Sequence, residues 1–542
     1  MKVAPAIVTP SSATKSLPSD APGPIGERWR ALERSLDRVF GAAGNPLRQL
    51  GALGFHLFWV VVVSGIYVYV FYDTSIEGAY RSIAALNEQP LSGLLMRSLH
   101  RYASDAFAIV CVLHLLREAV LGRFRGFRWF TWVSGVPTLW LMLITGIVGY
   151  WMVWDQLGSW VAVATLETLS WLPGFGASLV RNAIVEQNLS DRLFSLLVFV
   201  HIGVSLALLA LMWTHVQRLV RPVTSPARVP GWATLAVLVA LALVAPAPLH
   251  PPADPANLAG ALELDWFYLG ALVPAARMPG PTWVVAALMT VLLLGLPWIR
   301  LPSFKRARRS ALPTAPSLEP SAEPAVVDLE NCNGCGRCFA DCPYGAVVMV
   351  ARTDGARYFQ VQAQVDADLC AACGICAGSC PSATPFRPLT ELASGIDLPQ
   401  RPVDGLRKEV DDALDAQPGA VIVFACRHGA ASRTIAGPGL GSVDLLCSAQ
   451  LPPAFIDYAL RRGARGVVIA SCPEHDCEYR FGARWTLERI AGRREPRSRT
   501  TSNEPRLLVV QAARGEEARL VGAVAAWRAQ LSSIRPTDPL RS

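Results

Sequence analysis

Four histidines form two pairs whose spacing suits iron ligation. His100 and His114 are 14 residues apart, as are His201 and His215, and all four lie in apolar stretches. Fourteen residues make nearly four helical turns, so both rings of a pair lie on one helix face, about 21 Å apart. Two such helices side by side would form two bis-imidazole sites, one near each membrane face. For a single histidine, a hydrogen-bonded core residue is the alternative.

Two glycine pairs repeat the same period. Gly51 and Gly65 are 14 residues apart, and so are Gly135 and Gly149. Glycine inside a helix is less stable than alanine by about 1 kcal/mol. The pattern therefore predicts that a flat macrocycle presses against the backbone at both levels. Helix packing through small residues is the alternative.

Eight cysteines form two runs of one pattern, each ending in Cys-Pro at Cys342-Pro343 and Cys380-Pro381. The pattern resembles that of bacterial ferredoxins, in which each cubane takes three thiolates from one run and the fourth from the other. This implies one [4Fe-4S] cluster on Cys332, Cys335, Cys338 and Cys380, and a second on Cys370, Cys373, Cys376 and Cys342. The alternatives are zinc, which uses pairs of ligands, and disulfides, which are disfavoured in the cytoplasm.

Four later cysteines lie in a segment with alternating strand and helix patterns. Apolar runs at 420–425, 443–446, 466–470 and 506–512 alternate with helical patterns at about 453–463, 479–492 and 515–532. They predict an open, mostly parallel α/β sheet. Sites in such sheets lie beyond the carboxyl ends of the strands. Strands end just before three of the cysteines, so four thiols can converge there: Cys426, Cys447, Cys472 and Cys477.

The elements that must position the histidines are membrane helices. Mean hydropathy is +0.33 and charged residues make up 17% of the chain, which argues against an all-soluble protein. Stretches long enough to cross a bilayer occur at about 49–72, 93–120, 129–153, 194–217, 231–249 and 281–299. Six buried core helices are the alternative. The first 48 residues contain no apolar core typical of a signal peptide.

The distribution of Lys and Arg predicts the orientation. Most basic residues near the stretch ends lie on the side of the N-terminus, which is therefore expected in the cytoplasm. With six spans, the cysteine-rich half is cytoplasmic too. We expect the cytoplasmic membrane of a prokaryote, with His114 and His215 toward the cytoplasm and His100 and His201 toward the outer face.

Residues 28–300 resemble cytochrome b of the cytochrome bc complexes, especially the shorter photosynthetic form. Matching segments are Leu50-Gly51 through Ser64-Gly65, Arg97-Ser-Leu-His100-Arg101, Val133-Ser-Gly135 through Gly149-Tyr150, and Trp154-Asp155-Gln156. The resemblance implies two b haems, held by His100 with His201 and by His114 with His215. It also implies Arg97 and Arg101 near the haem propionates. The second half of this family is truncated here.

Leu264-Asp265-Trp266-Phe267 resembles the loop of that family that ends in Pro-Glu-Trp-Tyr, whose Glu takes a proton from quinol. Asp265 would be the corresponding proton acceptor, with a shorter reach. A solvated loop carboxylate is the alternative. His56 and Cys111 are interpreted as packing residues.

The last segment resembles the delta subunit of methyl-viologen-reducing hydrogenases, which carries a [2Fe-2S] cluster. The matching pieces are Phe424-Ala-Cys426, Leu446-Cys447-Ser448, and Cys472 to Cys477 followed by Glu478-Tyr479 and Gly482. That family usually has more cysteines in its first loop, where Arg427-His428-Gly429 stands here. His428 or His475 could therefore replace a thiolate, and a structural zinc is an alternative to the cluster.

The predicted fold has three parts: an all-α transmembrane haem-binding bundle of six spans, a ferredoxin-like α+β domain and an open-sheet α/β iron–sulfur domain. The expected boundaries are a cytoplasmic segment 1–48, a haem domain 49–225, two further membrane helices with a quinone-loop-like segment 226–301, a Pro-rich linker 302–326, a 2[4Fe-4S] domain 327–390 and a [2Fe-2S] domain 418–535.

Two functions fit this organisation. In the first, a cytoplasmic donor reduces the C-terminal cluster, electrons pass the two cubanes and the inner and outer haems, and quinone chemistry follows in the membrane. No Rossmann G-x-G-x-x-G follows a strand, so the substrate-oxidising site is expected on another chain: a flavin-containing, heterodisulfide-reductase-like or hydrogenase-like subunit. The second function is a membrane anchor and electron wire without a quinone site. A homodimer is one option for the assembly, and no nucleic-acid partner is expected.

Overall fold

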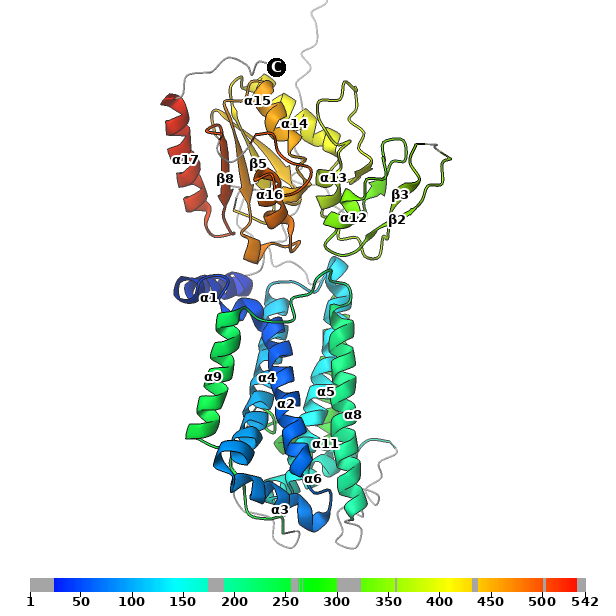
Figure 1. Ribbon diagram of the computed structural model, residues 1–542, viewed down its shortest axis with the longest axis vertical. Coiled ribbons are helices and arrows are strands. Elements are labelled where there is room, and N and C mark those ends of the chain that lie inside the picture. The colour runs from blue at the N-terminus through cyan, green and yellow to red at the C-terminus, as the bar shows by residue number, and fades with distance from the viewer. Residues whose placement is uncertain are drawn as a thin grey trace, which may run out of the picture.

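The apolar stretches before residue 300 form a bundle of helices (Figure 1). The computed structural model describes residues 24–173, 190–254, 262, 264–265, 267–299, 323–355, 358–430, 437–500 and 504–533. The helices of this half are α1 Pro24–Phe40, α2 Leu50–Phe71, α3 Ile76–Asn87, α4 Leu95–Val120, α5 Trp129–Val153, α6 Gln156–Leu169, α8 Asp191–Val216, α9 Arg228–Val244, α10 Leu272–Arg277 and α11 Pro279–Gly295.

Three of these helical segments are long and apolar enough to cross a membrane: 46–71, 126–153 and 191–216, which contain α2, α5 and α8. Helix α4 has 26 residues but carries several charged side chains. Helices α9 and α11 have 17 residues each, and α9 ends at Val244, before the predicted end at residue 249. The chain therefore has a multi-pass membrane region, whereas the count of six spans stays a prediction.

The helices that carry the histidines pack in two pairs. Helix α2 packs along α4, and α5 packs along α8. Each pair thus combines one glycine-bearing helix with one histidine-bearing helix. The two pairs together form the core of the bundle, in which Leu57, Phe107, Met142 and Leu208 are buried.

Helix α1 lies across the end of the bundle that faces the other domains (Figure 1). Its buried Glu33 accepts a hydrogen bond from the Nε of Arg117 at 2.8 Å and pairs with Arg48 at 3.3 Å. Arg48 also pairs with Asp37 at 2.8 Å. These ion pairs fix α1 to the ends of α2 and α4.

The ferredoxin-like domain contains short elements around the two cysteine runs. Helices α12 Arg337–Asp341 and α13 Ile375–Ser379 each contain the third cysteine of a run, Cys338 and Cys376. Strand β2 Val347–Ala351 pairs antiparallel with β3 Val361–Val365. Strand β1 Val326–Val327 pairs with β4 Ile396–Asp397, so the paired elements extend past the predicted boundary at 390. The predicted linker lies almost entirely outside the described residues.

The C-terminal domain has a four-stranded sheet in the order β6-β5-β7-β8, with every neighbouring pair parallel. Its elements are α14 Val403–Ala416, β5 Val421–Cys426, β6 Leu440–Leu445, α15 Ala454–Arg461, β7 Gly466–Ser471, α16 Gly482–Ile490, β8 Leu507–Gln511 and α17 Glu517–Ser533. The sheet agrees with the predicted open, parallel arrangement. Helix α14, in contrast, was not predicted.

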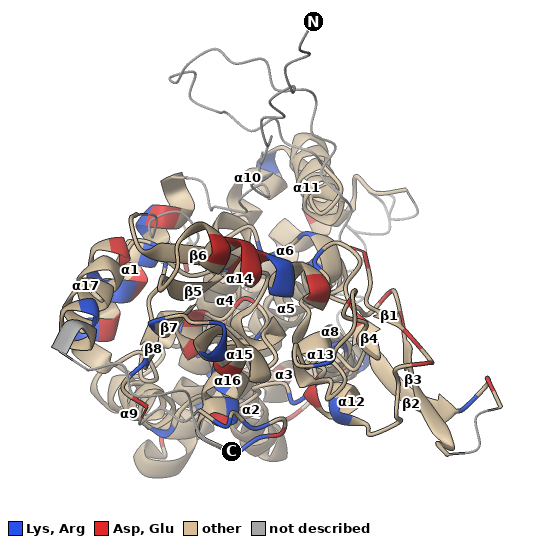
Figure 2. Cartoon of the chain, turned by 90° about the horizontal axis from the view of Figure 1, so that it is seen from above, with Lys and Arg blue, Asp and Glu red and all other residues tan. Residues whose placement is uncertain are grey.

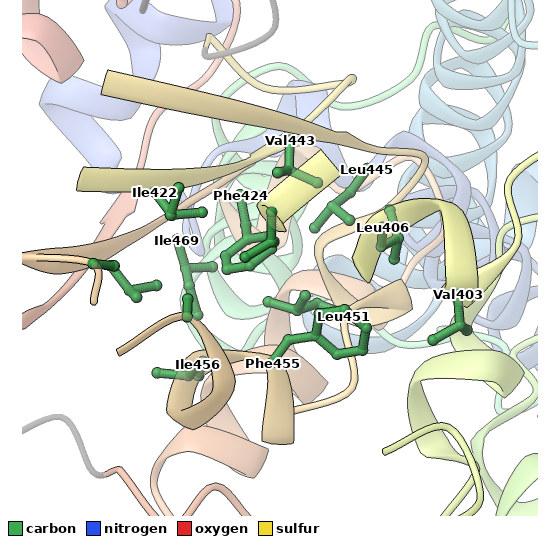
Figure 3. Close-up of a cluster of buried hydrophobic side chains, with 14 of the residues drawn as sticks. Val403, Leu406, Ile422, Phe424, Val443, Leu445, Leu451, Phe455, Ile456 and Ile469 are labelled. Atoms are coloured by element: carbon green, nitrogen blue, oxygen red, sulfur yellow. The ribbon is translucent and has the colours of Figure 1, made fainter. Parts of the chain in front are cut away.

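Alternating side chains of the central strands point to opposite faces of this sheet, as strand geometry requires. Ile422 and Phe424 contact α14 and α15 in one apolar core, shown in Figure 3. Val421 and Val423 face the other way, toward Leu520 and the rest of α17. Charged residues occur along α1, α14 and α17 (Figure 2). Helices thus cover both faces of the sheet. The cysteines lie at the carboxyl ends of its strands.

Candidate redox cofactor sites

The structure pairs the four histidines across α4 and α8 in the predicted combination. The ring centroids of His100 and His201 are 6.4 Å apart, and those of His114 and His215 are 6.5 Å apart. Two imidazole nitrogens on one metal, each about 2 Å from it, place the ring centroids about 6 Å apart. Both pairs therefore leave the room that one iron needs between two rings. The residues present fit bis-imidazole ligation at two levels.

Each of the four predicted glycines lies against one of these histidine rings. A Cβ atom would come 2.8 Å from His100 at Gly65 and 3.5 Å from His114 at Gly51. On the other helix pair, it would come 3.1 Å from His215 at Gly135 and 3.2 Å from His201 at Gly149. The glycine period therefore follows the histidine period because the rings need the space beside the neighbouring helix. The sequence analysis explained these glycines by contact with a macrocycle. Contact with the imidazole rings is a second explanation.

Three of the four rings have partners for their Nδ1 atom. His100 Nδ1 lies 3.0 Å from the Val61 carbonyl, and His201 Nδ1 lies 2.9 Å from the Thr145 carbonyl. His215 Nδ1 lies 3.1 Å from the Ser134 hydroxyl. Partners at Nδ1 orient a ring and direct its Nε2 toward a metal. The buried Nδ1 of His114 has no hydrogen-bond partner.

The two predicted propionate arginines have different surroundings. Arg97 donates to the side chain of Asn87 and to the carbonyls of Ala247 and Pro248 at 2.7–3.0 Å. It therefore ties the start of α4 to the segment after α9. Arg101, one position after His100, lies 4.2 Å from the ring centre of Tyr150 and pairs with Asp105 at 3.2 Å.

Asp265 belongs to the same group of side chains. Its carboxylate forms an ion pair with Arg101 and accepts a hydrogen bond of 2.5 Å from the Tyr150 hydroxyl. The neighbouring Tyr268 hydroxyl donates to the Met142 carbonyl at 2.8 Å. The structure thus brings Asp265 beside the residue that follows His100. Sequence reasoning did not predict Asp105 or Tyr150, although a carboxylate inside a membrane helix is itself a signal of function.

The first predicted ferredoxin set gathers around one pocket. Cys332, Cys335 and Cys338 line it together with Cys380 from the other run. Cys338 is buried, which raises its pKa to about 12, whereas Cys335 is exposed. The fourth thiol thus comes from the second run, as a two-cluster ferredoxin requires. These residues fit one cubane.

The second set lies deeper. Cys373 and Cys376 are buried, and burial raises the pKa of both thiols, with Cys370 and Cys342 adding to the rise as charged neighbours. Cys342, from the first run, therefore lies with three cysteines of the second run. The residues fit a second cubane, and Cys373 packs in one apolar core with Cys447 of the C-terminal domain.

The four C-terminal cysteines converge at the carboxyl edge of the sheet. Cys426 is the last residue of β5, and Cys472 directly follows β7. Cys472 contacts both Cys426 and Cys477 by hydrogen bonds, and Cys477 contacts Cys447. Hydrogen bonds from Cys447 and Cys472 lower the pKa of Cys477 well below that of an ordinary thiol. A thiolate is the form that binds metal.

Gly482 makes this convergence possible. A Cβ atom at this position would lie 2.2 Å from the sulfur of Cys447, which no side chain tolerates. The two alternative histidine ligands have other neighbours: His428 stacks edge-on against Tyr479, and His475 lies near Arg48 and Asp37. The described geometry thus favours four thiols as the donor set for one small cluster or ion.

Comparison with known proteins follows this division of the chain. Residues 44–221 match the family model of cytochrome b/b6/petB, residues 331–384 that of the 4Fe-4S dicluster domain, and residues 421–534 that of the methyl-viologen-reducing hydrogenase delta subunit. Cytochrome b6 of Euglena gracilis is 29% identical over 160 residues, which are 29% of this chain and 74% of that protein. A chain of a solved structure of a hyperthermophilic respiratory Complex III is similar over 50% of this chain and 82% of that chain, at 21% identity and a TM-score of 0.38.

The family-model matches and the cytochrome b6 relative support a multi-pass membrane electron-transfer subunit with b-type haem and iron–sulfur clusters. In chain order, its segments are similar to cytochrome b/b6, to a dicluster ferredoxin domain and to the hydrogenase delta subunit. The resemblance inferred from the motifs is thereby confirmed. The residues that hold the cofactors, and the number of cofactors, stay predictions.

The histidine pairing predicts the effect of His114→Ala. Removing one imidazole leaves His215 without an opposite ligand, so we expect haem content to fall from two to one per chain. The pyridine haemochrome assay measures this. His56→Ala is the matched control, because His56 is also a histidine of the bundle but is not paired with a second histidine ring in the described part of the chain. Two haems in the His114→Ala protein would show that the assignment is wrong.

The glycine contacts predict that Gly65→Ala weakens the haem site of His100 and His201. The added methyl group would stand 2.8 Å from the His100 ring and displace it. We expect loss or spectral change of that haem alone. Gly203→Ala in α8 is the control, because nothing lies within 4 Å of the position its Cβ would take. Equal haem spectra in both variants would contradict the role given to Gly65.

Proposed function

We propose that the chain passes electrons between a cytoplasmic redox partner and the quinone pool. The observation that carries this proposal is the shared core of the second ferredoxin set, the C-terminal set and Phe127 of the bundle, in a chain whose bundle has two histidine pairs at iron-ligation distance. When bound, two b haems, two [4Fe-4S] clusters and one [2Fe-2S] cluster would supply one-electron carriers. We place the chain in the cytoplasmic membrane of a prokaryote, with the cysteine-rich half in the cytoplasm.

The protein side chains would hold and isolate these carriers. His100, His201, His114 and His215 would serve as haem ligands, with a glycine of the neighbouring helix beside each ring. The apolar bundle around them excludes water. In the cysteine-rich half, buried Cys373 and Cys447 place the second ferredoxin set and the C-terminal set against one apolar core.

We further propose that quinone chemistry takes place beside Asp265. Quinone reduction consumes protons and quinol oxidation releases them, so such a site needs a group that exchanges protons. Asp265 and Tyr150 are in hydrogen-bond contact, and Arg101 joins them to the helix that bears His100. Arg101 would hold the carboxylate in place, and Tyr150 would link it to the bundle interior.

The substrate-oxidising reaction would belong to another chain. The C-terminal segment is similar to a hydrogenase delta subunit, which is by its name a part of a larger assembly. We therefore propose a cytoplasmic partner of the flavin-containing, heterodisulfide-reductase-like or hydrogenase-like kind. The second candidate function, an anchor and electron wire without a quinone site, is distinguished by quinone turnover with an artificial donor. Intact haem spectra without turnover would favour the anchor.

Metal content tests the cofactor assignment. We expect about ten iron atoms outside haem, eight in two cubanes and two in the C-terminal site. Plasma emission analysis of the purified protein gives this number directly, with haem iron subtracted by the haemochrome assay. About eight non-haem irons together with one zinc would instead establish the C-terminal thiols as a zinc site.

The Asp265 contacts predict the effect of Asp265→Asn. The amide keeps the size of the side chain but cannot take up a proton, so we expect quinone-linked turnover to fall about 10–1000-fold, as for a lost acid–base group. Haem content should not change. Glu77→Gln is the control, because Glu77 is an exposed carboxylate in α3 paired only with Arg81. Turnover equal to that of the parent would place quinone chemistry elsewhere, near the His114 and His215 pair.

A further inference from the structure

Helix α1 carries an apolar stripe that the rest of the described chain leaves largely exposed. We infer that this stripe lies in the phospholipid layer at the end of the bundle that faces the soluble domains, so that α1 is an interfacial membrane helix. The occupant of the stripe is lipid, and not a second copy of the chain or a partner protein. This surface is separate from the proposed function, and it differs from the expectation that residues 1–48 form a cytoplasmic segment.

The burial pattern of α1 is the reverse of that of an ordinary surface helix. Its charged Glu33 is 1% exposed, whereas Ile25 is 67%, Leu32 49% and Val39 73% exposed. A surface helix of a water-soluble protein turns its apolar side toward the core and its charged side toward water. A row of exposed apolar side chains along one helix therefore indicates a surface that binds a protein or a membrane.

The apolar residues of α1 follow the spacing of one helix face. They are three or four positions apart: Ile25, Trp29, Leu32, Leu36 and Val39. Because 3.6 residues make one turn, these side chains form a continuous stripe. Arg28, four positions before Leu32, is exposed at the margin of the stripe. An arginine there can reach lipid phosphates while its methylene groups stay on the apolar surface. The pattern is that of a helix that lies in a membrane interface.

One side of α1 is fixed to the bundle. Glu33 pairs with Arg117 and Arg48. The buried Asn45, in the turn between α1 and α2, donates to the Glu33 carbonyl and to Asp37, each at 2.8 Å. These contacts hold α1 at the start of α2, which belongs to a segment long and apolar enough to cross a membrane. Helix α1 thus lies at the level where the lipid layer ends.

A second side of α1 contacts the C-terminal domain. Arg30 pairs with Asp476 at 3.9 Å, and Arg34 donates a hydrogen bond to the Arg514 carbonyl at 3.4 Å. Figure 1 shows the C-terminal domain above α1 and the bundle below it. Arg30 and Arg34 therefore mark the side of α1 that faces away from the membrane.

The apolar stripe lies on the opposite side of α1 from these two arginines. Two positions along an α-helix rotate a side chain by about 200°, and nine positions rotate it by about two and a half turns. Leu32 is two positions from both Arg30 and Arg34. Ile25 is nine positions from Arg34, and Val39 is nine positions from Arg30. Because the arginines face the soluble domain, the stripe faces the membrane.

Exposed tryptophans mark the lipid boundary at the same end of the bundle. Trp232, near the start of α9, and Trp298, just after α11, are 70% and 63% exposed. Trp298 lies 5.8 Å from the ring of Trp129, the first residue of α5. Tryptophan is enriched where lipid meets water. Helix α1 lies near the edge of the molecule in both views (Figures 1 and 2), so its stripe extends this lipid-facing surface.

Photo-crosslinking of the full chain tests what covers the stripe. The chain is placed in vesicles of phosphatidylethanolamine and phosphatidylglycerol, with Leu32→p-benzoylphenylalanine in one variant and Val39→p-benzoylphenylalanine in another. Both positions are exposed enough to take the larger side chain. On illumination, the benzophenone carbonyl inserts into a C–H bond of the molecule that lies against it. We expect phospholipid adducts at both positions, identified by the mass of the protein.

Two further positions serve as controls. Phe199 of α8 is 74% exposed in a membrane helix, so the same side chain there should also give a phospholipid adduct. Arg38 is exposed on α1 but is two positions from Leu36. It therefore lies on the side of α1 opposite to the stripe, and we expect about tenfold less lipid adduct there than at Leu32.

The other outcomes overturn the inference. A covalent dimer would make a second copy of the chain the occupant. A crosslink to another segment of the same chain, such as residues 1–23, would make that segment the occupant. Lipid adducts at Phe199 but not at Leu32 or Val39 would leave the stripe to a partner protein. Equal adducts at Leu32 and Arg38 would show that lipid does not select the stripe.

Tryptic cleavage provides a second measurement with ordinary side chains. Leu32→Glu places a charge in the stripe, which opposes its burial in lipid. We expect trypsin to cleave the vesicle-bound chain at the arginines of α1 about tenfold faster, because cleavage follows the population of the released helix. Ala31→Glu is the matched control, since Ala31 is the exposed neighbour of Leu32 outside the stripe. Equal cleavage rates in the two variants would contradict the lipid contact.

Discussion

The spacing between two facing imidazole rings constrains the whole membrane half. A metal between two imidazole rings requires their centroids to stay about 6 Å apart. A second ring pair on the same two helices faces the same way only after a near-integral number of helical turns. The rings then occupy space that the adjacent helices would normally fill. Glycine at four positions removes the conflict, and it does so where α2 meets α4 and where α5 meets α8.

A second constraint acts between the soluble domains. Arg489 of α16 is almost fully buried and donates a 2.5 Å hydrogen bond to Asp341, the residue before Cys342. Arg494 pairs with the other oxygen of Asp341 at 2.8 Å. Breaking a buried pair of this kind typically costs about 3–5 kcal/mol, because one charge is left uncompensated. The ferredoxin-like and C-terminal domains are thus held in one relative position, which fixes the separation of their cysteine sets.

Periodic and closely spaced motifs were predictable from the sequence. The 14-residue repeats predicted that the two histidines of a helix share one face, because the helix pitch determines this. The resemblance of the cysteine runs to bacterial ferredoxins predicted that Cys380 belongs with the first run and Cys342 with the second. The alternation of apolar runs likewise predicted the parallel sheet. Helices α3 and α6 were missed, although Ser75 and Asp155 cap them by accepting hydrogen bonds from Gly78 and Gly158.

Long-range contacts were not predictable in this way. The partners of Asp265, the Asp341–Arg489 pair and the hydrogen bond of Arg480 to the Val220 carbonyl join residues more than a hundred positions apart, and no local pattern marks them. Helix α1 is a related case. It is polar on average, and only the ion pairs of Glu33 with Arg48 and Arg117 show why it lies on the bundle.

The burial of the C-terminal thiols has a consequence for biogenesis. Cys426, Cys447 and Cys472 are each about 1% exposed, and the loop after Cys477 is covered by the bundle. An assembly factor that delivers iron and sulfide needs access to these thiols before the domains close on one another. If the C-terminal thiols hold an iron–sulfur cluster, it has to be assembled before this domain docks onto the membrane half, whereas Cys335 of the first ferredoxin set stays exposed in the folded protein.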